Sequence, residues 1–98
     1  MVGDTYTLFS PTTVGAGSYL EVKPAAGQEI IIHNIYHEAD VEVRLVDGSG
    51  NALSFLEESG KNVFTNVYFH LTETQYLRIY NASGGAQWLA VDGIISLE

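Results

Sequence analysis

Hydrophobic and polar residues alternate with a period of two along most of this 98-residue chain. That period is typical of β-strands, and the 3.6-residue period of amphipathic helices is almost absent. In residues 40–46 aliphatic side chains alternate with polar ones, so this strand is predicted to bury Val41, Val43 and Leu45 and to expose the residues between them. The pattern therefore predicts an all-β protein.

Residues 29–36 are apolar on both faces, which is typical of a central strand. Simple alternation assigns four residues to one face: Ile30, Ile32, Asn34 and Tyr36. The intervening residues, including His33 and Ile35, are assigned to the other face.

About eight strands are predicted in all, at residues 6–9, 19–23, 29–36, 40–46, 53–57, 64–71, 76–81 and 87–97. Gly93 marks a bulge or bend in the last of them. Turns rich in Gly, Asn, Asp and Ser separate the strands at residues 24–27, 47–51, 59–62 and 81–85. This regular punctuation favours an antiparallel β-sandwich or jelly roll over βαβ units.

One stretch of the chain is echoed by another. In residues 34–50 a strand that begins with Asn and contains an aromatic residue is followed by a polar corner, a second strand and a turn. Residues 66–84 repeat that order. Each copy is interpreted as an antiparallel unit, and the two together as similar sheets packed face to face.

The first 18 residues differ from the rest, because they are small and polar around an apolar segment at residues 6–9. Two interpretations stay open for residues 1–18: an arm that lies on a neighbouring molecule, or an edge strand followed by a loop. Residues 19–98 are predicted to form a single β-sandwich domain.

Composition limits the function classes. The chain carries 12 acidic and 4 basic residues, a net charge of −8, and no cysteine. Scattered basic residues argue against a nucleic-acid surface. No apolar run is long enough to span a bilayer, and residues 1–4 do not resemble a signal peptide, so we expect no membrane contact and synthesis without a leader. No disulfide and no cofactor is expected.

Residues 47–58 imitate the ligand order of an EF-hand calcium loop, with Asp47, Ser49, Asn51 and Glu58. The sixth position is Ala52, where the motif needs Gly, and no helices flank the segment. A polar hairpin tip is therefore the favoured interpretation.

The histidines are weak candidates for a metal site. His33 and His37 on one strand are about 13 Å apart, too far to share one metal ion. His37 and His70 occupy equivalent places in the echoed stretches, so each ring is predicted to cap backbone groups at a corner.

Catalysis is not expected. Ser49 lies in a hairpin tip and not in a nucleophile elbow, and the acidic pairs at residues 57–58 and 38–40 lie at strand ends where solvated charges are usual.

Aromatic residues make up 11% of the chain. Most are expected to fill the core, but Tyr68, Tyr80 and Trp88 alternate with residues that are themselves apolar. A two-sheet domain has one interior, so some apolar surface is predicted to remain for a partner, either a protein or a stacked sugar.

Several strings resemble small structural proteins of tailed bacteriophages, above all the capsid decoration, or cement, proteins. They are residues 34–48, 66–81 and 87–94, with the phrases Val41-Glu42-Val43, Phe69-His70-Leu71-Thr72, Tyr76-Leu77-Arg78-Ile79 and Trp88-Leu89-Ala90-Val91-Asp92-Gly93-Ile94. The resemblance covers roughly the last two thirds of the chain and includes no catalytic motif.

The resemblance implies a compact β-sandwich, often a homotrimer, that is made in the host cytoplasm, seats on the outer capsid surface of the virion and clamps major capsid protein subunits. In such families the N-terminal arm frequently contacts the capsid. The expected interface residues are Val2, Tyr6, Leu8, Phe9, Tyr68, Tyr80 and Trp88. A carbohydrate-binding module, or a phage tail or fibre-tip adhesion domain, is the alternative.

Overall fold

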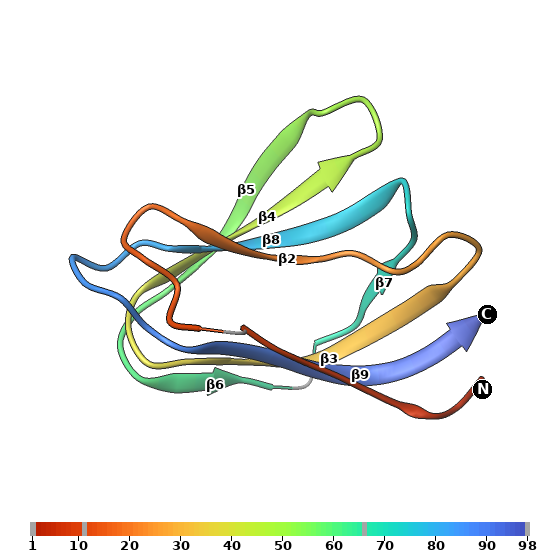
Figure 1. The fold of residues 1–98 in the computed structure, drawn as a ribbon, viewed down its shortest axis with the longest axis horizontal. Helices are drawn as coiled ribbons and strands as arrows, with labels where there is room; N and C mark the ends of the chain where they lie inside the picture. The colour runs from red at the N-terminus through yellow and green to blue at the C-terminus, as the bar shows by residue number, and fades with distance from the viewer. Residues whose placement is uncertain (1, 11, 66, 98) are drawn as a thin grey trace.

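The computed structural model describes residues 2–10, 12–65 and 67–97. Two antiparallel sheets lie face to face (Figure 1). The five-stranded sheet has the order β1 (Thr5–Phe9), β9 (Leu89–Leu97), β3 (Glu29–His37) and β6 (Asn62–Phe64), and β7 (Phe69–Leu71) also pairs with β3. The four-stranded sheet has the order β2 (Tyr19–Val22), β8 (Gln75–Asn81), β4 (Val41–Asp47) and β5 (Ala52–Glu58).

The predicted antiparallel β-sandwich is confirmed, and the described residues contain no helix. It follows that they contain none long and apolar enough to cross a membrane. Every connection except β4–β5 and β6–β7 passes from one sheet to the other. The finer expectation of a jelly roll stays a prediction.

The echoed stretches are arranged differently from the prediction. β3 and β4 lie in different sheets, as do β7 and β8, so neither stretch is a hairpin. Each is an arch between the two sheets, and the arches stack because β3 pairs with β7 and β4 pairs with β8. The repeat therefore reflects two arches of similar shape, but the prediction that each stretch forms an antiparallel pair was wrong.

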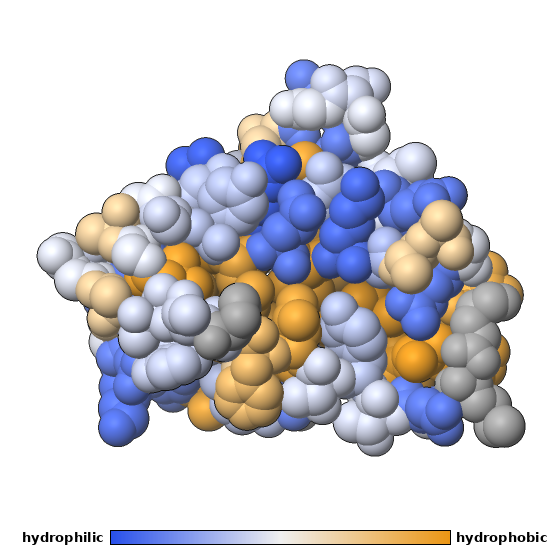
Figure 2. Space-filling model, in the orientation of Figure 1, coloured by the Kyte–Doolittle hydropathy of each residue, from blue (hydrophilic) through white to orange (hydrophobic). Residues whose placement is uncertain are grey.

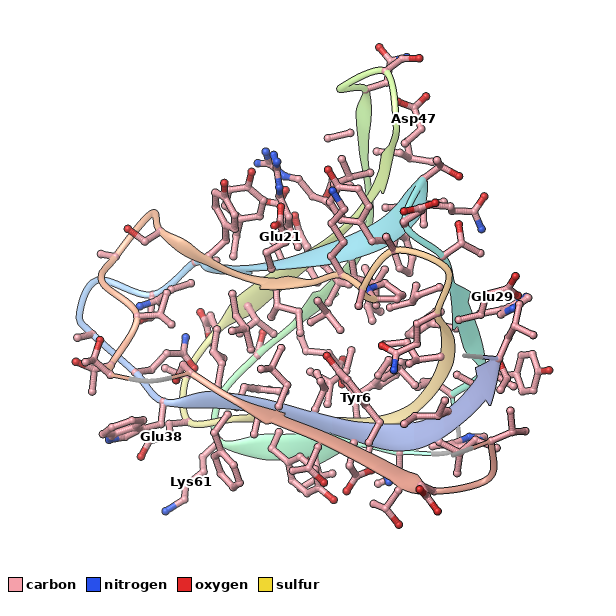
Figure 3. All side chains as sticks on the ribbon, turned by 45° about the vertical axis from the view of Figure 1, so that its right-hand side comes forward. Tyr6, Glu21, Glu29, Glu38, Asp47 and Lys61 are labelled. Atoms are coloured by element: carbon pink, nitrogen blue, oxygen red, sulfur yellow. The ribbon has the colours of Figure 1, made fainter. Side chains whose placement is uncertain are left out.

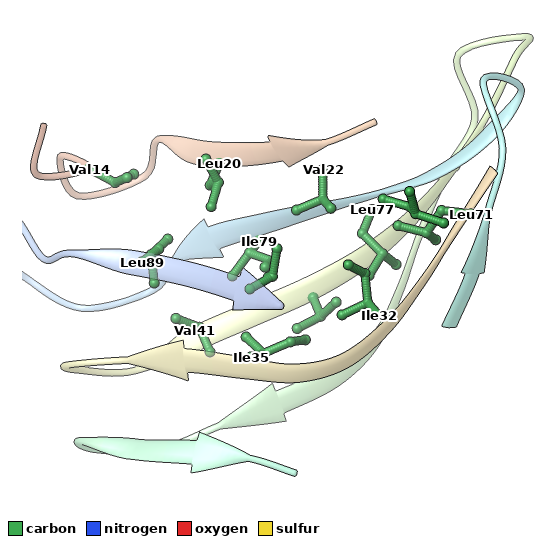
Figure 4. Packing of buried hydrophobic residues seen from close by; sticks show 13 residues of the cluster. Val14, Leu20, Val22, Ile32, Ile35, Val41, Leu71, Leu77, Ile79 and Leu89 are labelled. Carbon is green, nitrogen blue, oxygen red and sulfur yellow. The ribbon is translucent and has the colours of Figure 1, made fainter. Parts of the chain in front are cut away.

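The hydrophobic core fills the space between the sheets (Figure 4). Its fully buried side chains include Val22, Ile32, Val43, Leu77 and Ile79. Burial of each such side chain contributes about 1.5–3 kcal/mol, so this layer is the main source of stability. The predicted inward face of residues 40–46 is confirmed for Val41 and Val43, which are buried, and for Leu45, which packs partly buried against the cluster.

A β-bulge divides β3 into two halves of opposite phase. Ile32 pairs with Gly93 and Asn34 pairs with Asp92, so His33 between them is an extra residue. Before the bulge Ile30 and Ile32 face the core, and after it Ile35 does. Simple alternation had placed Asn34 and Tyr36 with Ile32, and the extra residue reverses that assignment.

The same irregularity splits the predicted strand at residues 64–71. β7 pairs with the first half of β3 and β6 with the second half, so the chain between them lies opposite the bulge. The backbone N–H of Val67 donates to the carbonyl of His33. In turn, Nδ1 of the His33 ring lies 3.1 Å from the Val67 carbonyl oxygen.

Gly93 allows the bulge because it has no side chain. A Cβ at this position would lie 1.8 Å from the carbonyl oxygen of Ile31 and 2.9 Å from the Cα of Ile32. These are backbone atoms of the neighbouring strand and cannot turn away as a side chain can. The bulge or bend predicted in the last strand at Gly93 lies instead in β3, where His33 is the extra residue, and Gly93 is the point on β9 at which the two backbones approach closely.

The N-terminal segment includes a strand of the sandwich. β1 pairs with β9 along Thr5–Phe9, and Tyr6 and Leu8 pack against the core cluster. Burial raises the pKa of the Tyr6 hydroxyl above its ordinary value. Of the two interpretations of residues 1–18, the described contacts match the edge strand followed by a loop.

Substitution Gly93→Ala is expected to destabilise the fold by about 3 kcal/mol or more, because the strands must separate to admit the methyl group. The measurement is the free energy of unfolding in urea. The matched control is Gly84→Ala, whose added Cβ meets nothing within 4 Å, with an expected change within about 0.5 kcal/mol. Equal losses in the two variants would contradict the close-approach account.

Candidate functional site

A row of side chains crosses the outer face of the five-stranded sheet. Val63 pairs with Tyr36, Tyr36 with Ala90, and Ala90 with Phe9, on four neighbouring strands. None of these residues is charged. The small Ala90 lies between two large rings, so the row has a low centre and raised sides.

This row forms the floor and walls of a groove of about 610 Å³. Trp88 lies beside it, two residues before Ala90, and is 48% exposed, while Phe9 is 67% exposed. Large apolar side chains that are buried in most proteins are here in contact with solvent. We take this aromatic groove as the candidate functional site.

Asp92 fixes the ring that forms one wall. Its Oδ2 accepts a hydrogen bond from the Tyr36 hydroxyl at 2.5 Å, and its Oδ1 accepts one from Asn34 Nδ2 at 2.6 Å. The bond to Asp92, partial burial and the carboxylate charge together raise the pKa of Tyr36. The groove therefore has a preorganised wall.

Polar groups lie at one end of the groove. The Glu38 carboxylate accepts a hydrogen bond from the backbone N–H of Trp88 at 2.6 Å. Lys61 and Asn62 line the same end, where Figure 3 shows Lys61 near Glu38. This end can offer both a hydrogen-bond donor and an acceptor to a bound molecule.

A buried polar cluster supports this end from behind. Gln87 is only 1% exposed, and its Oε1 accepts from the N–H groups of Glu38 and Ala39. Its Nε2 donates to the Asp40 carbonyl and to Asn81 Oδ1. Because every polar atom of the Gln87 amide is bonded, the corner that carries Glu38 is tied to the segment that carries Trp88.

Asn81 extends the cluster to the N-terminal segment. Its Nδ2 donates to the carbonyls of Val14 and Gly85, at 2.8 and 2.6 Å. Ser10 makes a further link, since its N–H donates to the Leu89 carbonyl and its hydroxyl accepts from the Leu89 N–H. Sequence analysis missed Ser10, Asn81 and Gln87, because polar residues near turns usually face solvent.

The outer face of the four-stranded sheet is built differently. Arg44 lies over the Tyr80 ring at 4.0 Å and bonds Glu42 at 2.5 Å. Arg78 lies over the Tyr19 ring at 4.7 Å. Arg78 also lies 3.3 Å from the Glu21 carboxylate. Each of the two arginines is thus paired with both a ring and a carboxylate. In Figure 2 hydrophilic residues cover this upper sheet, and an apolar band marks the seam below it.

The bond from Arg44, with a second from Ser54, lowers the pKa of the Glu42 carboxyl. The cation, ring and carboxylate contacts of this face satisfy one another, so it has less to offer a partner than the aromatic groove.

The residues predicted as an interface fall in different places. Phe9 and Trp88 meet at the groove. Tyr6 and Leu8 face the core, so the expected role of their side chains in a capsid contact does not fit their position. Three others lie apart from the groove: Val2 before β1, Tyr68 between β6 and β7, and Tyr80 on the opposite sheet.

Trp88 and Tyr80, two of the rings predicted to leave apolar surface for a protein or a stacked sugar, do not lie together. Tyr80 belongs to β8 in the four-stranded sheet, and its ring contacts Tyr19 at 4.9 Å and Arg44. The rings that do accompany Trp88 are those of Phe9 and Tyr36. The sequence did not reveal Tyr36, because the bulge that exposes it has no signature in the alternation.

The three histidines have separate surroundings. His37 is buried and its Nδ1 lies 3.0 Å from the Ala39 carbonyl oxygen, which confirms the predicted cap at this corner. His70 instead contacts Glu29 at 2.6 Å, so the equivalent prediction for it was wrong. His33 contacts Val67 and Tyr68. The described residues hold no cluster of three His, Asp or Glu that suits a metal ion.

The segment that imitates a calcium loop is the tip of the β4–β5 hairpin. Asp47 Oδ1 accepts from the N–H groups of Ser49 and Asn51, and Oδ2 accepts from Asn51 Nδ2. These bonds lower the pKa of the Asp47 carboxyl, the Asn51 side chain contributing most. Both carboxylate oxygens are used in closing the turn, as the hairpin-tip interpretation predicts.

Comparison with known proteins yields no family: no protein-family model matches the chain, and no curated protein is significantly similar to it.

Substitution Gln87→Met is expected to cost about 2–3 kcal/mol of stability, because it leaves buried groups on Glu38, Ala39, Asp40 and Asn81 without their partner. Urea unfolding provides the measurement. The exposed Gln75→Met is the control and should change stability by no more than about 0.5 kcal/mol. A loss confined to the control, or absent from both, would contradict the role assigned to Gln87.

Substitution Asp92→Ala is expected to lower the pKa of Tyr36 toward its ordinary value, since both the hydrogen bond and the negative charge are removed. In the unchanged protein the raised pKa means that folding favours the neutral Tyr36 hydroxyl. The resulting contribution to stability is fully present below the pKa that Tyr36 has in the unfolded chain, and it is lost as pH rises through its pKa in the folded protein. An NMR titration of the Tyr36 ring measures the shift. Asp47→Ala, which removes a distant carboxylate, should leave the Tyr36 titration in place.

Proposed function

We propose that this chain is a non-catalytic viral structural protein, a capsid decoration protein that docks on the outer capsid surface through its aromatic groove and stabilises the shell. The observation that carries the proposal is the uncharged row from Val63 to Phe9, flanked by Trp88, on the outer face of the five-stranded sheet. Protein interfaces are enriched in aromatic residues and depleted of charge at their centres.

The contrast between the two outer faces supports a protein partner. On the four-stranded sheet the guanidinium groups of Arg44 and Arg78 cover the Tyr80 and Tyr19 rings. Among the described residues, no arginine or lysine lies over a ring of the groove in this way. A stable interface buries about 800 Å² on each partner, for which a sheet face of four strands is a suitable platform. The major capsid protein is the partner proposed.

The assignment to a phage capsid rests on the resemblance of residues 34–48, 66–81 and 87–94 to decoration proteins, and on the net charge of −8. An acidic protein on the outer capsid surface of a virion is repelled by nucleic acid. The homotrimer that the resemblance implies stays a prediction. It needs two different patches on each copy, because a three-fold contact is head to tail.

The test adds the purified protein to capsids of its own phage. Saturable, stoichiometric binding is expected, and Trp88→Ser should weaken it about 30-fold or more, the effect of a residue worth 2 kcal/mol at an interface. The matched control is Tyr19→Ser, an exposed ring on the opposite sheet, which should bind as the unchanged protein does. Cosedimentation of capsids with labelled protein gives both affinities.

Single substitutions test the proposal better than deletion of residues 1–13. That deletion removes β1, including Tyr6 and Leu8 that pack against the core, so a loss of binding would also follow from a damaged fold. Absence of binding by the folded, unchanged protein, or equal loss in Trp88→Ser and Tyr19→Ser, would contradict the proposal.

A carbohydrate-binding module or adhesion domain is the second candidate function, and the ring geometry supports it. Trp88, Tyr36 and Phe9 surround one depression with Glu38 and Lys61 at its end, which provides stacking surfaces beside polar groups. Binding of defined glycans on an array, abolished by Trp88→Ala and retained by Tyr19→Ala, would establish this function in place of capsid docking.

A further inference from the structure

Two outward-facing tyrosines of the four-stranded sheet belong to groups of three: a ring, an arginine over the ring, and a carboxylate beside the arginine. In one group Arg44 lies 4.0 Å from the centre of the Tyr80 ring and 2.5 Å from the Glu42 carboxylate. Arg78 completes a second group of the same kind on this sheet. The molecule thus shows how a ring and a carboxylate on its surface together hold a cation.

The aromatic groove contains two of these three parts. Asp92 accepts a hydrogen bond from the Tyr36 hydroxyl, and Glu38 accepts one from the backbone N–H of Trp88. We call Tyr36 with Asp92, and Trp88 with Glu38, the two ring–carboxylate pairs. A carboxylate has about four acceptor sites, so both acids can accept further bonds. Because the described residues place no lysine or arginine over either ring, each pair can accept a cation from outside the chain.

The basic residues of this chain are engaged elsewhere or badly placed. Of the four, Lys23, Arg44 and Arg78 lie over rings of the four-stranded sheet. Lys61 lines the groove, but it lies over neither ring and forms no ion pair with a described carboxylate. A second copy of the chain has the same engaged arginines and is a poor donor. The donor is therefore a different molecule, and the net charge of −8 favours a basic one.

We propose that the aromatic groove docks a basic segment of its partner protein, which places one arginine at each ring–carboxylate pair. A guanidinium suits these pairs because it is planar, so it stacks on a ring while its N–H groups bond a carboxylate. Arginine, tyrosine and tryptophan are also the residues that contribute most to protein interfaces. The inference rests on the groove being the docking site of the proposed function, and it defines the chemistry of the partner there.

The spacing of the pairs sets the spacing of the arginines. Trp88 and Asp92 are four residues apart in the sequence, and Ala90 lies between them in the uncharged row. Four positions of extended chain span about 14 Å at about 3.4 Å per residue. An extended segment with arginines four residues apart therefore matches both pairs, and its middle residue faces the low centre of the groove at Ala90.

The experiment is a fluorescence titration of the full chain with a synthetic heptapeptide that has arginine at its second and sixth positions and glycine or serine elsewhere. Trp88 is the single tryptophan of the chain, so a change in its emission reports binding at the groove. Binding is expected to weaken as salt is raised, because salt screens charges at the surface. The same peptide with glutamate in place of arginine should bind at least about tenfold more weakly.

Two substitutions of equal charge locate the contact. Glu38→Gln removes the carboxylate charge and keeps an oxygen that can accept from the backbone N–H of Trp88, and it should weaken binding of the arginine peptide about threefold. Glu73→Gln is the matched control, because it changes the net charge equally at an exposed turn residue that does not line the groove. This control should bind the peptide as the unchanged protein does.

A third substitution tests the sign of the ligand's charge. Lys61→Gln removes a cation from the groove, so it should strengthen binding of the arginine peptide about threefold. Lys23→Gln makes the same change on the other sheet and should leave binding unchanged. Weaker binding by Lys61→Gln would indicate a groove for an anion and would overturn the inference.

The inference is also overturned if the arginine peptide leaves the Trp88 emission unchanged, if the glutamate peptide binds equally well, or if Glu38→Gln and Glu73→Gln lose equal affinity. Capsid binding tests the proposed function separately. Capsid binding that depends on Trp88, without binding of the arginine peptide, would retain the docking function and contradict the basic partner. Binding of the peptide without binding of capsids would support the basic partner and contradict the capsid assignment.

Discussion

The bulge at His33 is the constraint on which the rest of the structure depends. One extra residue in β3, opposite the link between Asp92 and Gly93, reverses the phase of the strand. It turns Tyr36 outward to Asp92 and keeps Ile35 in the core. The absence of a side chain at Gly93 is what lets the two backbones approach at this point. The core and the aromatic groove are thus two consequences of one local irregularity.

The two outer faces of the sandwich show how similar residues acquire different roles. Both carry exposed tyrosines, but on the four-stranded sheet Arg44 and Arg78 lie over the rings and bond neighbouring glutamates. Around the groove the rings flank Ala90, and the buried amide of Gln87 holds the corner beside Trp88. One face is closed by its own contacts, and the other is left available for a partner, which is the basis of the proposed docking function.

Much of the fold could be predicted from the sequence, because strand alternation and turn residues are local signals. The inward face of residues 40–46 and the cap made by His37 were found in this way, while the bulge predicted at Gly93 lies on the neighbouring strand. The bulge at His33 could not be found, since a period-two pattern gives no sign of a single extra residue. Sheet membership of the echoed stretches and the burial of Gln87 depend on pairing across the whole chain. For the site, sequence analysis therefore found Trp88 and Phe9 but missed Tyr36, and it included Tyr80, which lies on the opposite sheet.

The account is tested most directly by the position of the Tyr36 ring in solution. Nuclear Overhauser contacts from this ring to Val63 and Ala90 are expected, because both residues pair directly with Tyr36 in the outer row of the five-stranded sheet. Contacts from Tyr36 to core residues such as Val43 and Ile79, with Ile35 exposed instead, would show that β3 runs without the bulge, and that result would contradict the account.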